Sequence, residues 1–139
     1  MSFSARPLDQ APNVLIANNW ISDTYVSVLV DAAHTHADSD TQYSDISANV
    51  VSGTEIEINS KTLVTSGAFT YLKCNNLTYT SSHSAKFNYI VRKSGGTLVT
   101  SDYLLSKIDL NEGQTGNITV NGTLLINSNG LMYVQVTSS

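Results

Sequence analysis

Hydrophobic and polar side chains alternate in most apolar segments of this chain, and no other feature restricts its possible folds more. In YVSVLV, residues 25–30, and in AKFNYIVRK, residues 85–93, the period is two rather than 3.6. A period of two is typical of a β-strand, whose successive side chains point to opposite faces. The pattern therefore predicts an all-β fold, and the other expected strands are EIEINSKTLV, AFTYLKC, YLLSKIDL, NITVNGTLLI and LMYVQV.

Short reversals rich in glycine, asparagine and serine separate these segments. They are VSGT (51–54), KSGGT (93–97), NEGQTG (111–116) and NSNG (127–130). Gly and Asn tolerate the positive φ of tight turns. We therefore expect a single-domain antiparallel β-sandwich of jelly-roll or β-tulip-like type, in which only ANNWISDT (17–24) forms a helical turn.

The N-terminal stretch differs in composition from the rest of the chain. Residues 1–13 are polar, lack a core pattern and contain Pro7 and Pro12. We expect an extended N-terminal arm there, followed by the sandwich domain at residues 14–139. A chain of 139 residues suits one such domain.

Charge and apolar content exclude several classes of partner. The chain has seven basic residues, which are scattered, against 11 acidic ones, so it lacks the basic stripe of a nucleic-acid-binding protein. No apolar run approaches the roughly 20 residues that span a bilayer. Cys74 is the only cysteine, and MSFSARPLDQ is not a secretion signal, so we expect a soluble protein folded in a reducing cytoplasm, with no nucleic acid or membrane partner.

His34, His36 and Asp38 form an H-x-H-x-D row in AAHTHADSDTQYSD, residues 32–45. Zinc hydrolases gather ligands from such rows around a metal-activated water. Those enzymes draw further ligands from distant segments, whereas this chain has only one more histidine, His83, in the turn-like TSSHS. We therefore expect a solvated loop and no metal centre, with His34, His36 and Asp38 as the candidate ligands for adventitious Zn²⁺, Ni²⁺ or Ca²⁺.

Other residues with reactive side chains have a structural interpretation. Glu55 and Glu57 alternate with Ile56 and Ile58, as on a strand with one wet face, and Cys74 ends a strand as a small packed residue. The chain has no G-x-S-x-G elbow, and SGGT (94–97) has no helix after it that would cradle a phosphate. We expect no enzyme, no catalytic residue and no cofactor.

The aromatic side chains raise the possibility of a second kind of ligand, a carbohydrate. Trp20 and the tyrosines are rings of the kind that sugar-binding modules stack on glycans, yet Tyr89 lies in phase with Ala85, Phe87 and Val91 and is expected to face the core. Tyrosines suit subunit interfaces equally well.

Four stretches in this order resemble a family of short structural proteins of tailed bacteriophages, including head-decoration proteins. In that family a strand ends in a variable acidic loop, and a D-[IV]-S-A-N motif follows, which matches Asp45 to Asn49. The V-S-G-T motif matches Val51 to Thr54. The resemblance covers residues 14–136, and the stretches are YVSVLVDAAHTHADSDTQYSDISANVVSGT, INSKTLV, NNLTYTSSHSAKFNYIVRK and LLSKIDLNEGQTGNITVNGTLLINSNGLMYV.

The resemblance implies a capsid cement protein on the outer surface of the phage head. Such a protein stabilises the shell by binding across junctions of the major capsid protein, here expected as a homotrimer. Arg6, Pro7 and Pro12 in the arm are the expected contacts with the shell or a neighbouring protomer. Two alternatives remain open: a tail or fibre structural protein, and a carbohydrate-binding adhesion module of the virion.

Overall fold

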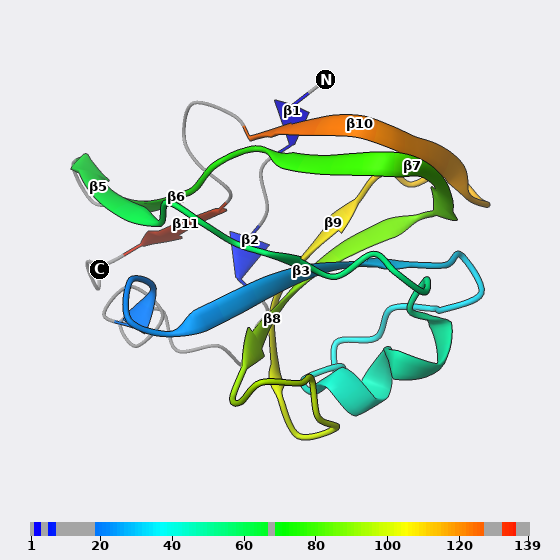
Figure 1. Ribbon diagram of the computed structural model, residues 1–139, viewed down its shortest axis with the longest axis horizontal. Coiled ribbons are helices and arrows are strands. Elements are labelled where there is room, and N and C mark those ends of the chain that lie inside the picture. Colours follow the sequence, from blue (N-terminus) through cyan, green and yellow to red (C-terminus); the bar gives the residue numbers. More distant parts are fainter. Residues whose placement is uncertain (1, 4–5, 8–18, 67–68, 127–131, 136–139) are drawn as a thin grey trace.

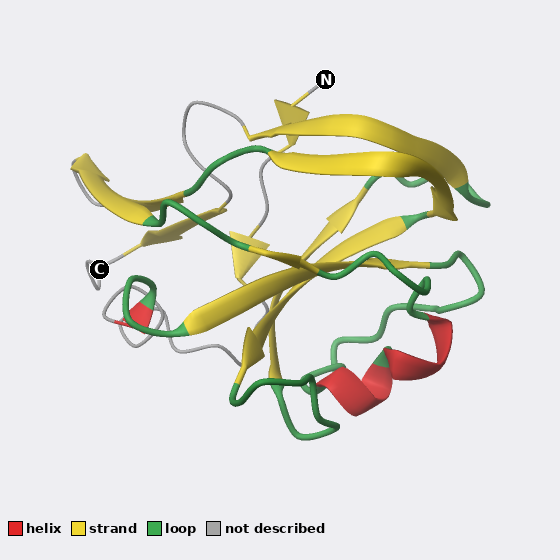
Figure 2. Cartoon of the chain, viewed as in Figure 1, coloured by secondary structure: helices red, strands yellow, loops and turns green. Residues whose placement is uncertain are grey.

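The computed structural model describes residues 2–3, 6–7, 19–66, 69–126 and 132–135, and the regular secondary structure of this part of the chain is mainly β-strand (Figures 1 and 2). The strands form one five-stranded and two three-stranded sheets. Their bounds are β1 (Ser2–Phe3), β2 (Arg6–Pro7), β3 (Thr24–Val30), β4 (Ile56–Glu57), β5 (Thr62–Ser66), β6 (Phe69–Lys73), β7 (Leu77–Ala85), β8 (Phe87–Lys93), β9 (Tyr103–Asp109), β10 (Ile118–Ile126) and β11 (Met132–Gln135).

Strand β3 lies near the middle of the five-stranded sheet, whose order is β2-β9-β8-β3-β4. It pairs antiparallel with β8 without a break, from Thr24 opposite Lys93 to Val30 opposite Phe87. Residues 25–30 are all buried, so both faces of this strand are covered. The alternation that predicted the strand therefore distributes its side chains between two different cores.

The first core lies between the five-stranded sheet and the sheet of order β1-β10-β7 (Figure 1). Tyr25 and Leu29 of β3 point into it, as does Ile90 of β8. Trp20 is fully buried there, its ring is 5.0 Å from that of Tyr25, and its Nε1 donates a 3.2 Å hydrogen bond to the carbonyl of Lys73. This packing of sheet on sheet gives the molecule its sandwich-like character.

The second core lies on the opposite face of the same sheet. Val26, Val28 and Val30 pack there against Phe87 and Tyr89. The segment 31–50 covers this face and ends in two 3-10 helices, η1 (Tyr43–Asp45) and η2 (Ser47–Asn49), drawn below the sheet in Figure 2. Ile46 joins the helices and is fully buried against the valine face.

The all-β, antiparallel prediction is confirmed, while the jelly-roll or β-tulip-like arrangement stays a prediction. Six of the expected strands are present as β3, β6, β8, β9, β10 and β11. The seventh, EIEINSKTLV, is divided into β4 and β5. Ser60 has a φ of 54° and interrupts it. The expected turn at 111–116 contains Gly113 and Gly116 with φ of 80° and 87°, whereas the expected turn at 127–130 lies outside the described residues.

The prediction of a turn at TSSHS is wrong, because these residues belong to β7. The strand pairs with β10 along most of its length, including Ser84 opposite Thr119 and His83 opposite Val120. It occupies the edge of its sheet, where Thr80, Ser81 and Ser82 are exposed. Because the centre of β7 faces water, its side chains there are polar, and a short run of serine and threonine resembles the sequence of a turn.

The described residues of the N-terminal stretch form two short strands, β1 and β2. Strand β1 pairs parallel with β10, and β2 places Arg6 opposite Lys107 and Pro7 opposite Ser106. Both strands contain only two residues and add to sheet edges of the chain itself. The division into an arm at 1–13 and a domain at 14–139 stays a prediction, since residues 8–18 lie outside the described part.

Candidate functional site

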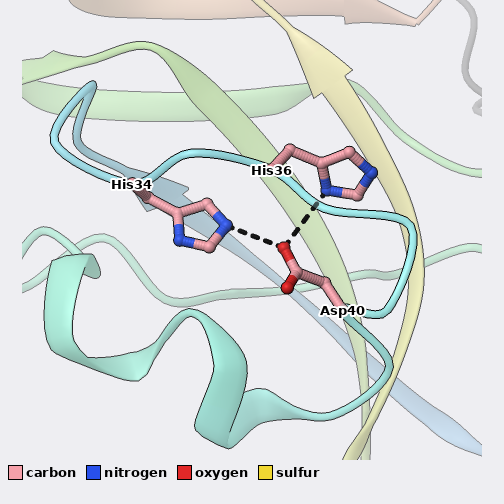
Figure 3. Close-up of side chains that lie close together, drawn as sticks. All are labelled: His34, His36 and Asp40. Atoms are coloured by element: carbon pink, nitrogen blue, oxygen red, sulfur yellow. Dashed lines mark hydrogen bonds and ion pairs between the residues drawn. The ribbon is translucent and has the colours of Figure 1, made fainter.

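His34, His36 and Asp40 converge in the loop that follows β3 (Figure 3). Asp40 Oδ2 lies 2.9 Å from His34 Nε2 and 3.4 Å from His36 Nδ1. The three ligand-type atoms lie within 4.8 Å of one another. We call these three residues the His-Asp group.

A set of short hydrogen bonds determines the path of the loop into this group. The carboxylate of Asp31 accepts from the amide of Ala33 at 2.8 Å and from Asn117 Nδ2 at 3.0 Å. The amide of Asp40 donates to the carbonyl of Ala37, and Ala37 donates back to Asp40 Oδ2 at 3.1 Å. This reciprocal turn directs the Asp40 side chain back toward the two histidines.

Aromatic rings of β8 form the floor of the His-Asp group. The Tyr89 hydroxyl lies 2.9 Å from His36 Nδ1, and the His34 ring meets those of Phe87 and Tyr89 edge to face. Burial lowers the pKa of His36 below its ordinary value, and the charge of Lys107 lowers it further, although Asp40 opposes both effects. This shift favours the neutral form of the His36 imidazole.

The structure differs from the sequence prediction in two respects: the carboxylate beside the two histidines belongs to Asp40 and not to Asp38, and the loop is less solvated than expected. Asp38 is exposed and does not belong to the group, whereas Asp40 is 8% exposed and His34 is 9% exposed. The expected solvated loop is therefore a packed one at these residues. The turn at Ala37 to Asp40 causes the change, because it reverses the chain after Asp38, and the turn-forming A-D-S-D sequence was its only signal.

The other titratable candidates have the structural roles that the sequence suggested. Glu55 and Glu57 are exposed while Ile58 is buried, and Glu55 forms an ion pair with Lys93 at 2.6 Å. Burial raises the pKa of the Cys74 thiol to about 11, so it remains protonated at neutral pH.

The described aromatic rings give little support to a sugar platform. Trp20 is fully buried, and Tyr25, Tyr79 and Tyr89 are core residues, as predicted for Tyr89. Tyr103 is exposed, at 58%. A shallow depression of about 460 Å³ lies elsewhere, and its wall includes Asp31, Asn49 and His83.

A second candidate surface is the outer edge of β5, defined here by Thr62, Leu63 and Val64 and called the β5 edge. Within the described residues β5 pairs only with β6 and ends its sheet. Leu63 is 40% exposed and Val64 is 42% exposed, and as neighbours in a strand they face opposite sides.

Among the residues that the structure describes, those of the β5 edge include no charged side chain, whereas natural edge strands commonly carry charged side chains that prevent pairing. The strand TLVTS carries no charge. The preceding Lys61 donates to the carbonyl of Asp23 and lies 5.3 Å from the centre of the Tyr25 ring, so its charge is directed toward its own domain.

The predicted contact residues of the arm are only partly described. Arg6 and Pro7 lie in β2 beside β9, and Pro12 is outside the described residues. Whether they contact a capsid stays a prediction.

No helix in the described part of the chain is long and apolar enough to cross a membrane. Comparison with known proteins found no matching family model, no matching curated protein and no matching solved structure.

Proposed function

We propose that this chain is a structural protein of a tailed-phage virion, without enzymatic activity, that decorates the outer surface of the head. It binds across junctions between major capsid proteins and acts as a homotrimer. The phage context comes from the sequence resemblance. The structural observation that carries the proposal is the β5 edge, which is suited to a protein partner.

An unpaired edge strand presents a row of free N–H and C=O groups that an extended segment of another protein can pair with. The β5 edge adds apolar side chains on both faces of the strand, Leu63 and Val64, next to that row. Backbone pairing supplies affinity and the two side chains supply register. We infer that an extended segment of the major capsid protein adds to β5.

Because this contact is repeated in each protomer, a weak interface is sufficient for stable binding to the capsid. In a trimer the three copies of β5 engage neighbouring capsid subunits together, and each further contact forms at high effective concentration. Such binding needs no cofactor or reactive residue, which agrees with the structural roles of Glu55, Glu57 and Cys74 described above.

Co-sedimentation of the full-length protein with undecorated, expanded heads of the phage that encodes it tests the proposal. We expect saturable binding, with density at symmetry axes of the shell in cryo-EM images. Binding to purified tails alone would favour the tail or fibre alternative, and binding to neither would contradict a virion role.

A matched pair of valines tests the β5 edge itself. Val64 and Val99 are 42% and 44% exposed, but Val99 lies in the loop before β9. We expect Val64→Lys to weaken head binding at least about tenfold, because the lysine charge must be desolvated in the interface, and Val99→Lys to bind like the wild type. Equal binding by the two variants would show that β5 is not the contact.

A further inference from the structure

The His-Asp group contains the ligand types of a transition-metal site. It offers two imidazole nitrogens and one carboxylate oxygen from residues that are largely removed from solvent. Imidazole suits zinc, copper and nickel, and zinc sites with two histidines are commonly completed by a carboxylate. Mg²⁺ and Ca²⁺ prefer shells made of oxygen alone.

The spacing of the three atoms is close to what a tetrahedral ion requires. With bonds of about 2.0–2.2 Å, neighbouring ligands of tetrahedral zinc lie about 3.4 Å apart. His36 Nδ1 is 3.4 Å from Asp40 Oδ2, and His34 Nε2 is 2.9 Å from the same oxygen. The His36–Asp40 pair therefore has the required separation, and the His34–Asp40 pair must open by roughly half an ångström. The third pair, His34 Nε2 and His36 Nδ1, lies within 4.8 Å.

We propose that His34 Nε2, His36 Nδ1 and Asp40 Oδ2 bind one divalent transition-metal ion of the zinc class. His36 retains 17% side-chain exposure, so a water molecule reaches the fourth position. Three protein ligands with one open position are a common zinc arrangement.

Metal binding replaces hydrogen bonds that the metal-free group makes. A carboxylate only accepts, so the 2.9 Å contact has His34 Nε2–H donating to Asp40. When the ion binds Nε2, that proton moves to Nδ1 of the same ring. The Tyr89 hydroxyl, now 2.9 Å from His36 Nδ1, is released to donate to the bound water.

The consequence of the site is mechanical, because all three ligands come from the loop that covers the second core. The loop lies against Phe87 and Tyr89 through edge-to-face contacts of His34. An ion tied to His34, His36 and Asp40 closes this segment on itself and holds it over the valine face of β3. At a free metal concentration of 100 Kd the folding equilibrium constant rises about 100-fold.

Calorimetric titration of the untagged, EDTA-treated full chain with ZnCl₂ is the first test. We expect saturation at one equivalent with a micromolar or lower Kd, a matching rise in the midpoint of thermal unfolding, and no such response to MgCl₂ or CaCl₂. Substitution with Co²⁺ should produce the visible absorption of a tetrahedral nitrogen and oxygen site, a readout that does not depend on any variant.

His83 provides a matched control, since it is a partly exposed histidine on β7 and is outside the group. We expect His36→Gln and Asp40→Asn to weaken Zn²⁺ binding at least about tenfold, each with a wild-type circular dichroism spectrum, and His83→Gln to leave the Kd unchanged. Absence of saturable binding by the wild type would overturn the proposal and leave a hydrogen-bond network alone. A loss caused equally by His83→Gln would overturn it too, as adventitious histidine binding.

Discussion

Three buried polar side chains on different strands form hydrogen bonds with one another in the first core. Asn88 Nδ2 donates to Ser27 Oγ at 2.6 Å and to the Tyr79 hydroxyl at 3.2 Å, and Ser27 and Tyr79 are also joined at 3.2 Å. Asn88 and Ser27 are fully buried, so these bonds replace water that the groups lose on folding. The network links β3, β7 and β8.

Removal of one hydroxyl tests this network. We expect Tyr79→Phe to lower the free energy of unfolding by about 1 kcal/mol, because Asn88 and Ser27 each lose a partner inside the core. Tyr103→Phe is the control, since that ring is 58% exposed, and it should change stability by less than about 0.5 kcal/mol. Urea denaturation at pH 7 measures both, and a Tyr79→Phe protein as stable as the wild type would show that the network contributes nothing.

At the scale of elements, strand β10 contains a bulge that its sequence only hints at. The pairing with β7 shifts register between Val120 and Gly122, and Gly122 has a φ of 93°. That backbone conformation strains any residue with a Cβ atom. The N-G pair within NITVNGTLLI therefore marks a bulge inside a continuous strand and not a reversal.

Alanine substitution separates backbone strain from crowding at this position. A Cβ added at Gly122 or at Gly95 meets no atom within 4 Å, but only Gly122 has a positive φ. We expect Gly122→Ala to lower stability by about 1–2 kcal/mol and Gly95→Ala to be neutral or slightly stabilising. Thermal unfolding of the two variants gives the comparison, and equal midpoints would mean that the bulge carries no strain.

At the scale of the whole molecule, two aspartates hold loops through several hydrogen bonds each. Asp102 is 2% exposed and accepts from the Ser94 amide and hydroxyl and from the Val99 amide. Burial alone would raise the pKa of Asp102, but these bonds outweigh it and hold the pKa below its usual value. The pKa of Asp109 is lowered in the same way, against the effect of burial, by Lys86 and by the amides of Asn111 and Gly113.

These depressed pKa values predict acid sensitivity. A carboxyl whose folded pKa is below its unfolded value stabilises the protein above the unfolded pKa of about 4 and ceases to do so as pH falls through the folded pKa. We therefore expect the contribution of Asp102 and Asp109 to be complete at pH 5–7 and to fall progressively below about pH 4.

Urea denaturation between pH 7 and pH 2.5 checks this expectation. Asp102→Asn should lower the free energy of unfolding by about 1–3 kcal/mol at neutral pH, because the asparagine amide has one accepting oxygen where the carboxylate has two. The stability of this variant should decline less steeply in acid than that of the wild type. Glu57→Gln, at an exposed position on β4, should follow the wild-type curve. A wild-type slope retained by Asp102→Asn would contradict the assignment.

How much of the molecule the sequence predicts depends on which side chains face apolar surroundings. In β3 and β8 both faces are packed, so these strands are rich in apolar and β-branched side chains that the sequence displays, and at β4 Ile56 and the following Ile58 mark the inner side. In β7 only Leu77, Tyr79 and Ala85 are buried, so the serines between them carry no such pattern. The 3-10 helices were missed because their stability comes from the burial of Ile46 and from the Asp45 carboxylate, which accepts from the amides of Thr41 and Gln42.

The amino-acid sequence by itself determined the all-β class, most of the strands, the structural roles of Glu55 and Glu57, and the presence of two nearby histidines, because these follow from local periodicity and spacing. Tertiary structure alone decided that β3 serves two cores, that β5 ends its sheet within the described part of the chain, and that Asp40 joins His34 and His36 over Tyr89. Those features depend on contacts between segments distant in sequence and on one turn geometry. Neither the long-range contacts nor the turn produces a periodic pattern in the sequence.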